Sequence, residues 1–195
     1  AYIAATRGRV PVIVHVGHNA LVEACGLAEH AQASGATAIA AVPPSYFKPR
    51  DIETAVECYR VIASAAPQLP LYGYYIPSLT GVTLSAADML QRGAERIPTL
   101  RGLKYTHEDL AEYQYCLQLD DGRFNCLWGR DEMLLGALAM GSTAAVGSTY
   151  GFATPLYRRL WAAFRDGDMD TARVCQARAN AVIRLLHAHG GTACC

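Results

Sequence analysis

The sequence predicts an α/β protein of the (β/α)8 TIM-barrel type, with about six βα units within its 195 residues. Short apolar runs alternate with longer amphipathic segments from end to end, which is typical of parallel strands joined by helices. Polar and aromatic residues also gather at the carboxyl ends of most apolar runs. A closed barrel brings such ends together over one mouth, whereas an open sheet spreads them along an edge.

Six apolar runs are predicted to be strands buried on both faces, because each run is nearly continuous and does not alternate with polar residues. In chain order they span residues 10–17, 36–44, 69–77, 99–106, 124–131 and 142–150. The polar and aromatic residues at their ends are His15, Tyr46, Tyr74, Lys104, Thr106, Asp131, Glu132 and Ser148. A dinucleotide-binding fold is disfavoured, because no G-x-G-x-x-G turn follows the first strand.

The segments between these runs are predicted to be helices. They span residues 20–35, 50–66, 85–95, 109–119 and 133–141, and a final pair broken at Gly167 spans 155–190. Gly35, Gly93, Gly141 and Gly190 are expected just past helix ends, where a left-handed residue is common. The first eight residues resemble the end of a helix.

Composition bounds the class of protein. Hydrophobic residues make up 52% and charged residues 17%, which is typical of a folded enzyme. The net charge of zero disfavours nucleic acid and anionic membranes as partners, and no apolar run is long enough to span a membrane. Seven irregularly spaced cysteines predict reduced, buried thiols and a cytoplasmic protein, with Cys194 and Cys195 expected in a frayed end.

We expect residues 1–195 to form a single, partial barrel domain. A complete barrel takes about 250 residues, so two strands are expected to be missing and the chain to be a fragment of a longer protein.

Lys104 is one of only two lysines, in a chain that otherwise takes its positive charge from arginine. Burial disfavours the charged form of an amine and lowers its pKa. A neutral amine can form a Schiff base with a ketone, which arginine cannot do because it stays protonated. The sequence therefore predicts a nucleophilic Lys104. The alternative is a salt-bridged surface lysine.

Tyr74 ends the strand one βα unit before Lys104, so its phenol is expected at the same mouth, where it could shuttle a proton. The alternative is a tyrosine that packs in the core with its hydroxyl satisfied.

Several motifs together resemble the N-acetylneuraminate lyase branch of the dihydrodipicolinate synthase superfamily. They are VPVIVHVG (10–17), PPSYFKP (43–49), YYIPSLTGV (74–82), GLKYTHEDL (102–110), WGRDE (128–132) and AVGSTY (145–150). The resemblance covers essentially the whole chain. It implies a (β/α)8 barrel, a class I (Schiff-base) aldolase mechanism without a cofactor, and a homotetramer when the protein is full length.

The resemblance also implies roles for individual residues. Lys104 matches the Schiff-base lysine, and Tyr74 matches the proton shuttle that also contacts the substrate carboxylate. Tyr46 matches an aromatic position that in many members takes part in a tyrosine relay across the subunit interface. The positions that hold the sugar are matched by Thr106, Gly129, Asp131, Glu132 and Ser148.

One position separates the branches of the superfamily. Dihydrodipicolinate synthases carry an arginine shortly after the tyrosine motif, and this chain has Leu79 there. The expected function is cleavage of N-acetylneuraminate (sialic acid) to N-acetylmannosamine and pyruvate. The alternatives are a related 2-keto-acid aldolase or dihydrodipicolinate synthase-like enzyme, and a non-catalytic fragment or paralogue acting in assembly or binding. That last alternative is motivated by the GTTGE-type motif of the family, which does not occur in this sequence.

His15 and His18 are not expected to bind metal, because their spacing on a strand and turn does not place them on one face. No metal site is predicted. Arg130 is expected to pair with a neighbouring acid.

Overall fold

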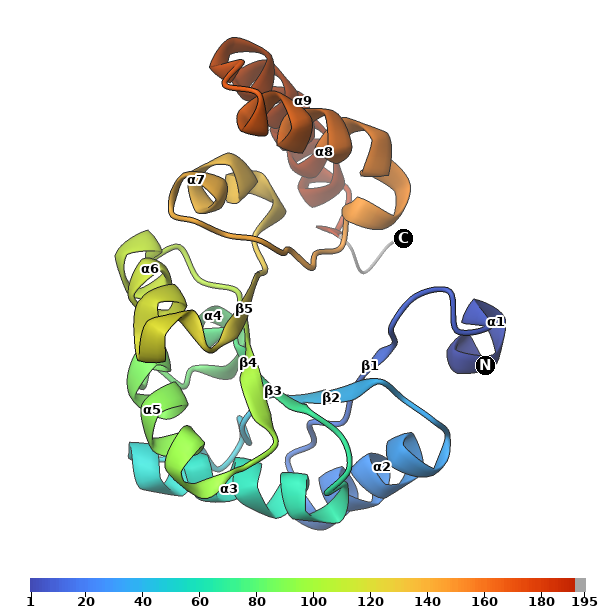
Figure 1. The fold of residues 1–195 in the computed structure, drawn as a ribbon, viewed down its shortest axis with the longest axis vertical. Coiled ribbons are helices and arrows are strands. Elements are labelled where there is room, and N and C mark those ends of the chain that lie inside the picture. Colours follow the sequence, from blue (N-terminus) through green and yellow to red (C-terminus); the bar gives the residue numbers. More distant parts are fainter. Residues whose placement is uncertain (192–195) are drawn as a thin grey trace.

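Five parallel strands form one sheet at the centre of the computed structural model, which describes residues 1–191 (Figure 1). Neighbouring strands follow chain order, from β1 through β5. The strands are β1 (Ile13–His15), β2 (Ala38–Ala41), β3 (Leu71–Tyr75), β4 (Leu100–Tyr105) and β5 (Asn125–Trp128). This arrangement confirms the predicted α/β class and the partial barrel.

Helices separate the strands and lie along the outer side of the sheet, and α8 and α9 follow beyond β5 (Figure 1). The α-helices are α1 (Tyr2–Thr6), α2 (Leu21–Ala33), α3 (Ile52–Ala65), α4 (Pro77–Thr80), α5 (Ala86–Arg96), α6 (Leu110–Gln118), α7 (Leu134–Ala139), α8 (Tyr150–Arg165) and α9 (Met169–Ala188). Two short 3₁₀ turns are η1 (Leu119–Gly122) and η2 (Asp131–Met133). The predicted helices are present, whereas α4 and both 3₁₀ turns were not predicted.

Side-chain caps explain where four of the helices begin. Asp51, Ser85, Asp109 and Asp168 each accept a hydrogen bond from a backbone N–H in the first turn of the following helix. Such caps satisfy donors that have no partner inside the helix. Gly167 has a φ of +80° between α8 and α9, which confirms the predicted break there.

The two faces of the sheet have different surroundings. In β3, Leu71, Gly73 and Tyr75 are buried, and the Cα of Gly73 faces the ring of Tyr59 from α3. Because strand residues alternate between faces, Tyr72 and Tyr74 lie on the opposite face, which is only half-buried. The prediction of strands buried on both faces is therefore wrong for these residues. Five strands form an open arc, and helices cover its outer side only.

The predicted sixth strand is also wrong. Residues 142–150 pair with β5 through a single bridge between Trp128 and Ala145. The hydrogen bonds there run from Trp128 N to Ala144 O at 2.9 Å and from Val146 N to Trp128 O at 2.8 Å. The pairing does not continue past Val146, and at Gly147 the backbone packs closely against the carboxylate of Asp131.

Gly93 does not end its helix as predicted, because it lies inside α5. It is buried, and a Cβ there would come within 2.7 Å of the Leu100 side chain. The glycine therefore allows α5 to pack closely against β4.

Within the described residues, the five cysteines are free thiols, and four of them are buried. Cys194 and Cys195 lie outside the described residues. Among residues 1–191, no helix has both the length and the apolar character needed to cross a bilayer.

Candidate active site

Lys104 and Tyr74 meet on the inner face of the sheet. They are paired residues in the register of β3 and β4, and the Lys104 Nζ donates a hydrogen bond to the Tyr74 hydroxyl at 2.9 Å. The same Nζ lies 4.1 Å from the centre of the Tyr74 ring, within range of a cation–π interaction. Strand alternation explains this placement, since Leu103 and Tyr105 on either side of Lys104 are buried on the outer face.

His15 lies beside this pair. Its ring meets the Tyr74 ring edge-on, with 6.0 Å between the ring centres. Partial burial lowers the pKa of His15 below its ordinary value, and the positive charge of Lys104 lowers it further. Hence the imidazole next to the amine is predominantly neutral at neutral pH.

His18 lies in the loop after β1, where its Nδ1 accepts a hydrogen bond from the Ala20 backbone N–H at 3.1 Å. Within residues 1–191, no three histidine, cysteine or acidic side chains gather as a metal ion would require.

Thr106 follows Lys104 at the end of β4, and its hydroxyl is buried without a hydrogen-bond partner among the described residues. Gly129 lies against it, because the Gly129 N–H donates to Tyr105 O at 2.7 Å. A Cβ on Gly129 would overlap the Thr106 side chain. Glycine is therefore required at this position, and the packing at the end of β4 leaves the Thr106 hydroxyl buried without a partner in the described residues.

Asp131 is only 6% exposed and is directed toward the protein. Its Oδ2 accepts hydrogen bonds from the Thr149 backbone N–H at 2.8 Å and from the Thr149 hydroxyl at 2.5 Å. A Cβ on Gly147 would overlap the same carboxylate. Glycine at position 147 thus lets the backbone approach the Asp131 carboxylate closely.

Glu132 is one-third exposed and is bound by Arg130. The guanidinium Nε lies 3.1 Å and a terminal nitrogen 2.9 Å from the same oxygen, Oε1 of Glu132. Arg130 also contacts Glu108, in the loop after β4, with 2.9 Å from nitrogen to Oε2. The predicted pairing of Arg130 with a neighbouring acid is confirmed, and the guanidinium bridges two loops.

Gln176 of α9 supports the turn that carries Asp131 and Glu132. Its Nε2 donates to Asp131 O at 3.1 Å, and its Oε1 accepts from the Leu135 N–H at 2.9 Å. One side chain therefore joins the start of η2 to the start of α7. No sequence signal pointed to this residue, because it lies 45 positions from Asp131.

Tyr150 places another buried hydroxyl near this turn, without a partner in the described part of the chain. Burial raises its pKa well above the ordinary range, and the negative charge of Asp131 raises it further. Its ring packs edge-on against Tyr157, 4.4 Å away between ring centres.

Ser148 and Tyr46 are not brought against Lys104 in the described residues. Ser148 is exposed. Tyr46 is 77% exposed and packs edge-on against Phe47, which is 84% exposed. Asn19 holds the loop that contains Tyr46 and Phe47, because its Oδ1 accepts a hydrogen bond from the Tyr46 N–H at 3.0 Å. The sequence prediction did not include Asn19.

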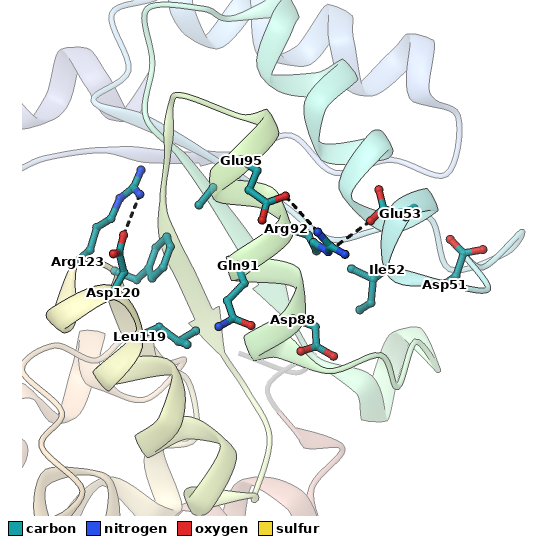
Figure 2. A pocket seen from close by; sticks show the side chains of 12 residues that line it. Asp51, Ile52, Glu53, Asp88, Gln91, Arg92, Glu95, Leu119, Asp120 and Arg123 are labelled. Atoms are coloured by element: carbon teal, nitrogen blue, oxygen red, sulfur yellow. Dashed lines mark hydrogen bonds and ion pairs between the residues drawn. The ribbon is translucent and has the colours of Figure 1, made fainter.

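A groove between α3, α5 and η1 lies elsewhere in the structure (Figure 2). It has a volume of about 1030 Å³ and includes none of the predicted site residues. Arg92 spans its wall, pairing with Glu53 and Glu95 at 3.6 and 3.3 Å. It is an open, charged groove between helices, whereas Lys104, Tyr74 and His15 meet on the inner face of the sheet.

Known proteins that are similar in sequence to this chain include N-acetylneuraminate lyases of vertebrates. N-acetylneuraminate lyase A of Xenopus laevis is 41% identical over 176 residues, which are 90% of this chain and 57% of that protein. The N-acetylneuraminate lyase of Mus musculus is 40% identical over 179 residues, which are 89% of this chain and 56% of that protein.

Solved structures are similar along almost the whole chain. The Proteus mirabilis N-acetylneuraminate lyase superposes with a TM-score of 0.95 at 33% identity and covers 98% of this chain and 64% of its own. The enzyme from Aliivibrio salmonicida also gives 0.95, at 38% identity, over 98% of this chain and 63% of its own. This chain therefore spans between about half and two thirds of the length of these relatives.

The Dihydrodipicolinate synthetase family matches residues 2–193. Because that match covers nearly every residue, the chain belongs to the dihydrodipicolinate synthetase family.

Proposed function

We propose that the whole protein containing this chain is a Schiff-base aldolase that cleaves N-acetylneuraminate to N-acetylmannosamine and pyruvate. The contact between the Lys104 Nζ and the Tyr74 hydroxyl, at 2.9 Å on the inner face, carries this proposal. Relatives named N-acetylneuraminate lyase support it. So does a sialic acid aldolase of Ruminococcus gnavus, 28% identical, whose solved structure is described as a catalytic lysine mutant.

The proposed reaction begins with attack of the Lys104 amine on the C2 ketone of the open-chain sugar acid, and loss of water gives an iminium ion. The C3–C4 bond then breaks, and its electron pair moves to the iminium, which becomes an enamine. Tyr74 relays the proton of the C4 hydroxyl, directly or through the substrate carboxylate. N-acetylmannosamine leaves as the aldehyde. Protonation of the enamine at C3 and addition of water then release pyruvate and restore the amine.

Polar groups near the ends of β4 and β5 support a polyhydroxylated substrate. We propose that Thr106, Gly129, Asp131, Glu132 and Ser148 hold the sugar portion. The support at the end of β4 is the buried Thr106 hydroxyl, which has no partner in the described residues, since native proteins seldom leave such a group unpaired. Asp131 already accepts two hydrogen bonds from Thr149, so its contribution includes holding the 147–149 turn in place.

We further propose a homotetramer in the cytoplasm, with Tyr46 at a subunit interface. The support is the exposure of Tyr46 and Phe47 side by side, since large exposed apolar patches commonly mark contact surfaces. Replacement of Tyr46 with alanine should then shift the sedimentation coefficient of the whole protein toward smaller species. An unchanged assembly would contradict a role for this side chain in the interface.

A cleavage assay tests the substrate. The whole protein should release pyruvate from N-acetylneuraminate faster than from 2-keto-3-deoxy sugar acids. Preference for the shorter acids would indicate a related 2-keto-acid aldolase. Failure to release pyruvate from any of them would favour a non-catalytic role.

A further inference from the structure

Arg130 lies between the loop that follows β4 and the loop that follows β5. Its carbonyl oxygen accepts hydrogen bonds from the Trp128 indole N–H and from the Met133 backbone N–H. The preceding residue, Gly129, is bound to the backbone of β4 at Tyr105. These hydrogen bonds fix the backbone of Arg130, and therefore the position of its Cα, relative to β4 and η2.

The guanidinium joins two carboxylates that come from different βα loops. It contacts Glu132 through two nitrogens and Glu108 through a third. Arg130 is 27% and Glu132 is 33% exposed, so this pair is shielded from solvent more than an ordinary surface ion pair. Glu108 is 60% exposed, and its Oε2 also lies 3.3 Å from His107 Nδ1. Solvent therefore screens the Arg130–Glu108 ion pair more than the Arg130–Glu132 ion pair.

Only arginine among the cationic side chains has the donors for this geometry. Its planar fork presents five N–H groups, whereas lysine presents one compact ammonium. In the described residues, both contacts to Glu132 end on Oε1. Oε2 therefore remains available to accept hydrogen bonds from neighbouring hydroxyls of a ligand.

We propose that Arg130 is a positioning residue that sets specificity for the polyhydroxyl chain of the substrate. It does so by occupying one oxygen of Glu132 and presenting the other. This inference rests on the proposed function, because it assumes that Glu132 faces the sugar portion. Arg130 has no role in bond cleavage, since its contacts are with Glu132 and Glu108 and not with Lys104 or Tyr74.

The test compares variants of the whole protein: Arg130→Met, which keeps an apolar stem but removes the charge, and Arg130→Lys, which keeps the charge without the fork. Arg123→Met is the matched control, because Arg123 forms a comparable 2.9 Å pair with Asp120 on the outer side. For each protein, kcat and KM are measured with N-acetylneuraminate and with a shorter 2-keto-3-deoxy sugar acid. Borohydride trapping of pyruvate on Lys104 is measured in parallel.

The expected result for Arg130→Met is a KM for N-acetylneuraminate raised about tenfold, the effect of losing one hydrogen bond to a charged group. Pyruvate trapping, kcat and the KM for the shorter acid should stay within about twofold, a modest change on the same scale. Arg130→Lys should recover part of the loss, and Arg123→Met should match the unaltered protein.

Two results would overturn the inference. One is an unchanged KM for N-acetylneuraminate in Arg130→Met. The other is an equal loss for both substrates together with lost trapping, which would assign Arg130 a purely structural role. If the unaltered protein traps no pyruvate, the proposed function itself fails, and that outcome is visible before any variant is compared.

Discussion

The Lys104 Nζ and the Tyr74 hydroxyl lie 2.9 Å apart as register partners on adjacent parallel strands. Their separation is set by backbone pairing and not by a flexible loop, so the amine and the phenol are held together before any substrate arrives. Such preorganisation is what a proton relay beside a Schiff base requires.

The Tyr74 hydroxyl can be removed without disturbing the strand. Tyr74→Phe in the whole protein should lower kcat for N-acetylneuraminate at least about a hundredfold, the usual contribution of a positioned proton-transfer group. Pyruvate trapping on Lys104 should persist, because the amine is intact. Tyr72→Phe is the control, since Tyr72 is half-buried on the same strand and face. Equal kcat values for the two variants would contradict the relay.

The pKa of His15 provides a test of its proximity to Lys104. Lys104→Met should move the His15 pKa part of the way back toward 6.5, because burial is the larger cause of its depression and Lys104 the smaller. NMR titration of the His15 ring in the unaltered protein and in the variant measures this shift. No movement would show that the ring does not sense the charge of Lys104.

The same depression predicts how stability depends on pH. The unfolded state takes up a proton on His15 near pH 6.5, whereas the folded state takes it up only at a lower pH. The contribution of His15 to stability should therefore be full above pH 6.5 and decline as the pH falls through the folded pKa. Denaturant unfolding of His15→Gln should show a weaker pH dependence in that window. An unchanged profile would contradict the assignment.

Gly147 and Gly151 give a matched pair for the turn around Asp131. Gly147→Ala should lower the free energy of unfolding by about 1–3 kcal/mol, because its Cβ would overlap the Asp131 carboxylate. Gly151→Ala, in α8 with no heavy atom within 4 Å of the added Cβ, should be neutral or stabilise by up to about 1 kcal/mol. Denaturant unfolding measures both values. Equal effects would show that the turn relaxes freely.

Two neighbouring tyrosines should respond oppositely to loss of the hydroxyl. The Thr149 hydroxyl donates to Asp131, so Tyr157 donates to Thr149, and Tyr157→Phe should cost about 1 kcal/mol of unfolding free energy. The Tyr150 hydroxyl is buried without a partner in the described residues, so Tyr150→Phe should be neutral or stabilising. Thermal or denaturant unfolding distinguishes them. A larger loss for Tyr150→Phe would mean that its hydroxyl is bonded in the folded protein.

Local patterns were enough to predict the five strands and the meeting of Lys104 with Tyr74. Both residues end neighbouring apolar runs, and the carboxyl ends of parallel strands lie together. The error at residues 142–150 reflects a contact that is not local in the sequence, because the backbone at Gly147 packs against a carboxylate 16 positions earlier. Composition of the run alone could not show that contact.

Long-range polar contacts were less predictable. Gln176 reaches Asp131 from α9, and Arg130 reaches Glu108 across 22 positions. Neither pairing has a periodic or motif signature, because each depends on how separate βα units pack. The sequence suggested an acidic partner for Arg130 but did not identify the bridge between two loops.

Borohydride trapping tests the central claim most directly. The whole protein is incubated with pyruvate, reduced, digested and analysed by peptide mass spectrometry. The chain contains only two lysines, so Lys48 serves as an internal control. We predict one reduced pyruvate adduct on the peptide that contains Lys104, none on Lys48, and none in Lys104→Arg, whose guanidinium stays protonated. Absence of an adduct on Lys104 in the folded whole protein would contradict the Schiff-base mechanism.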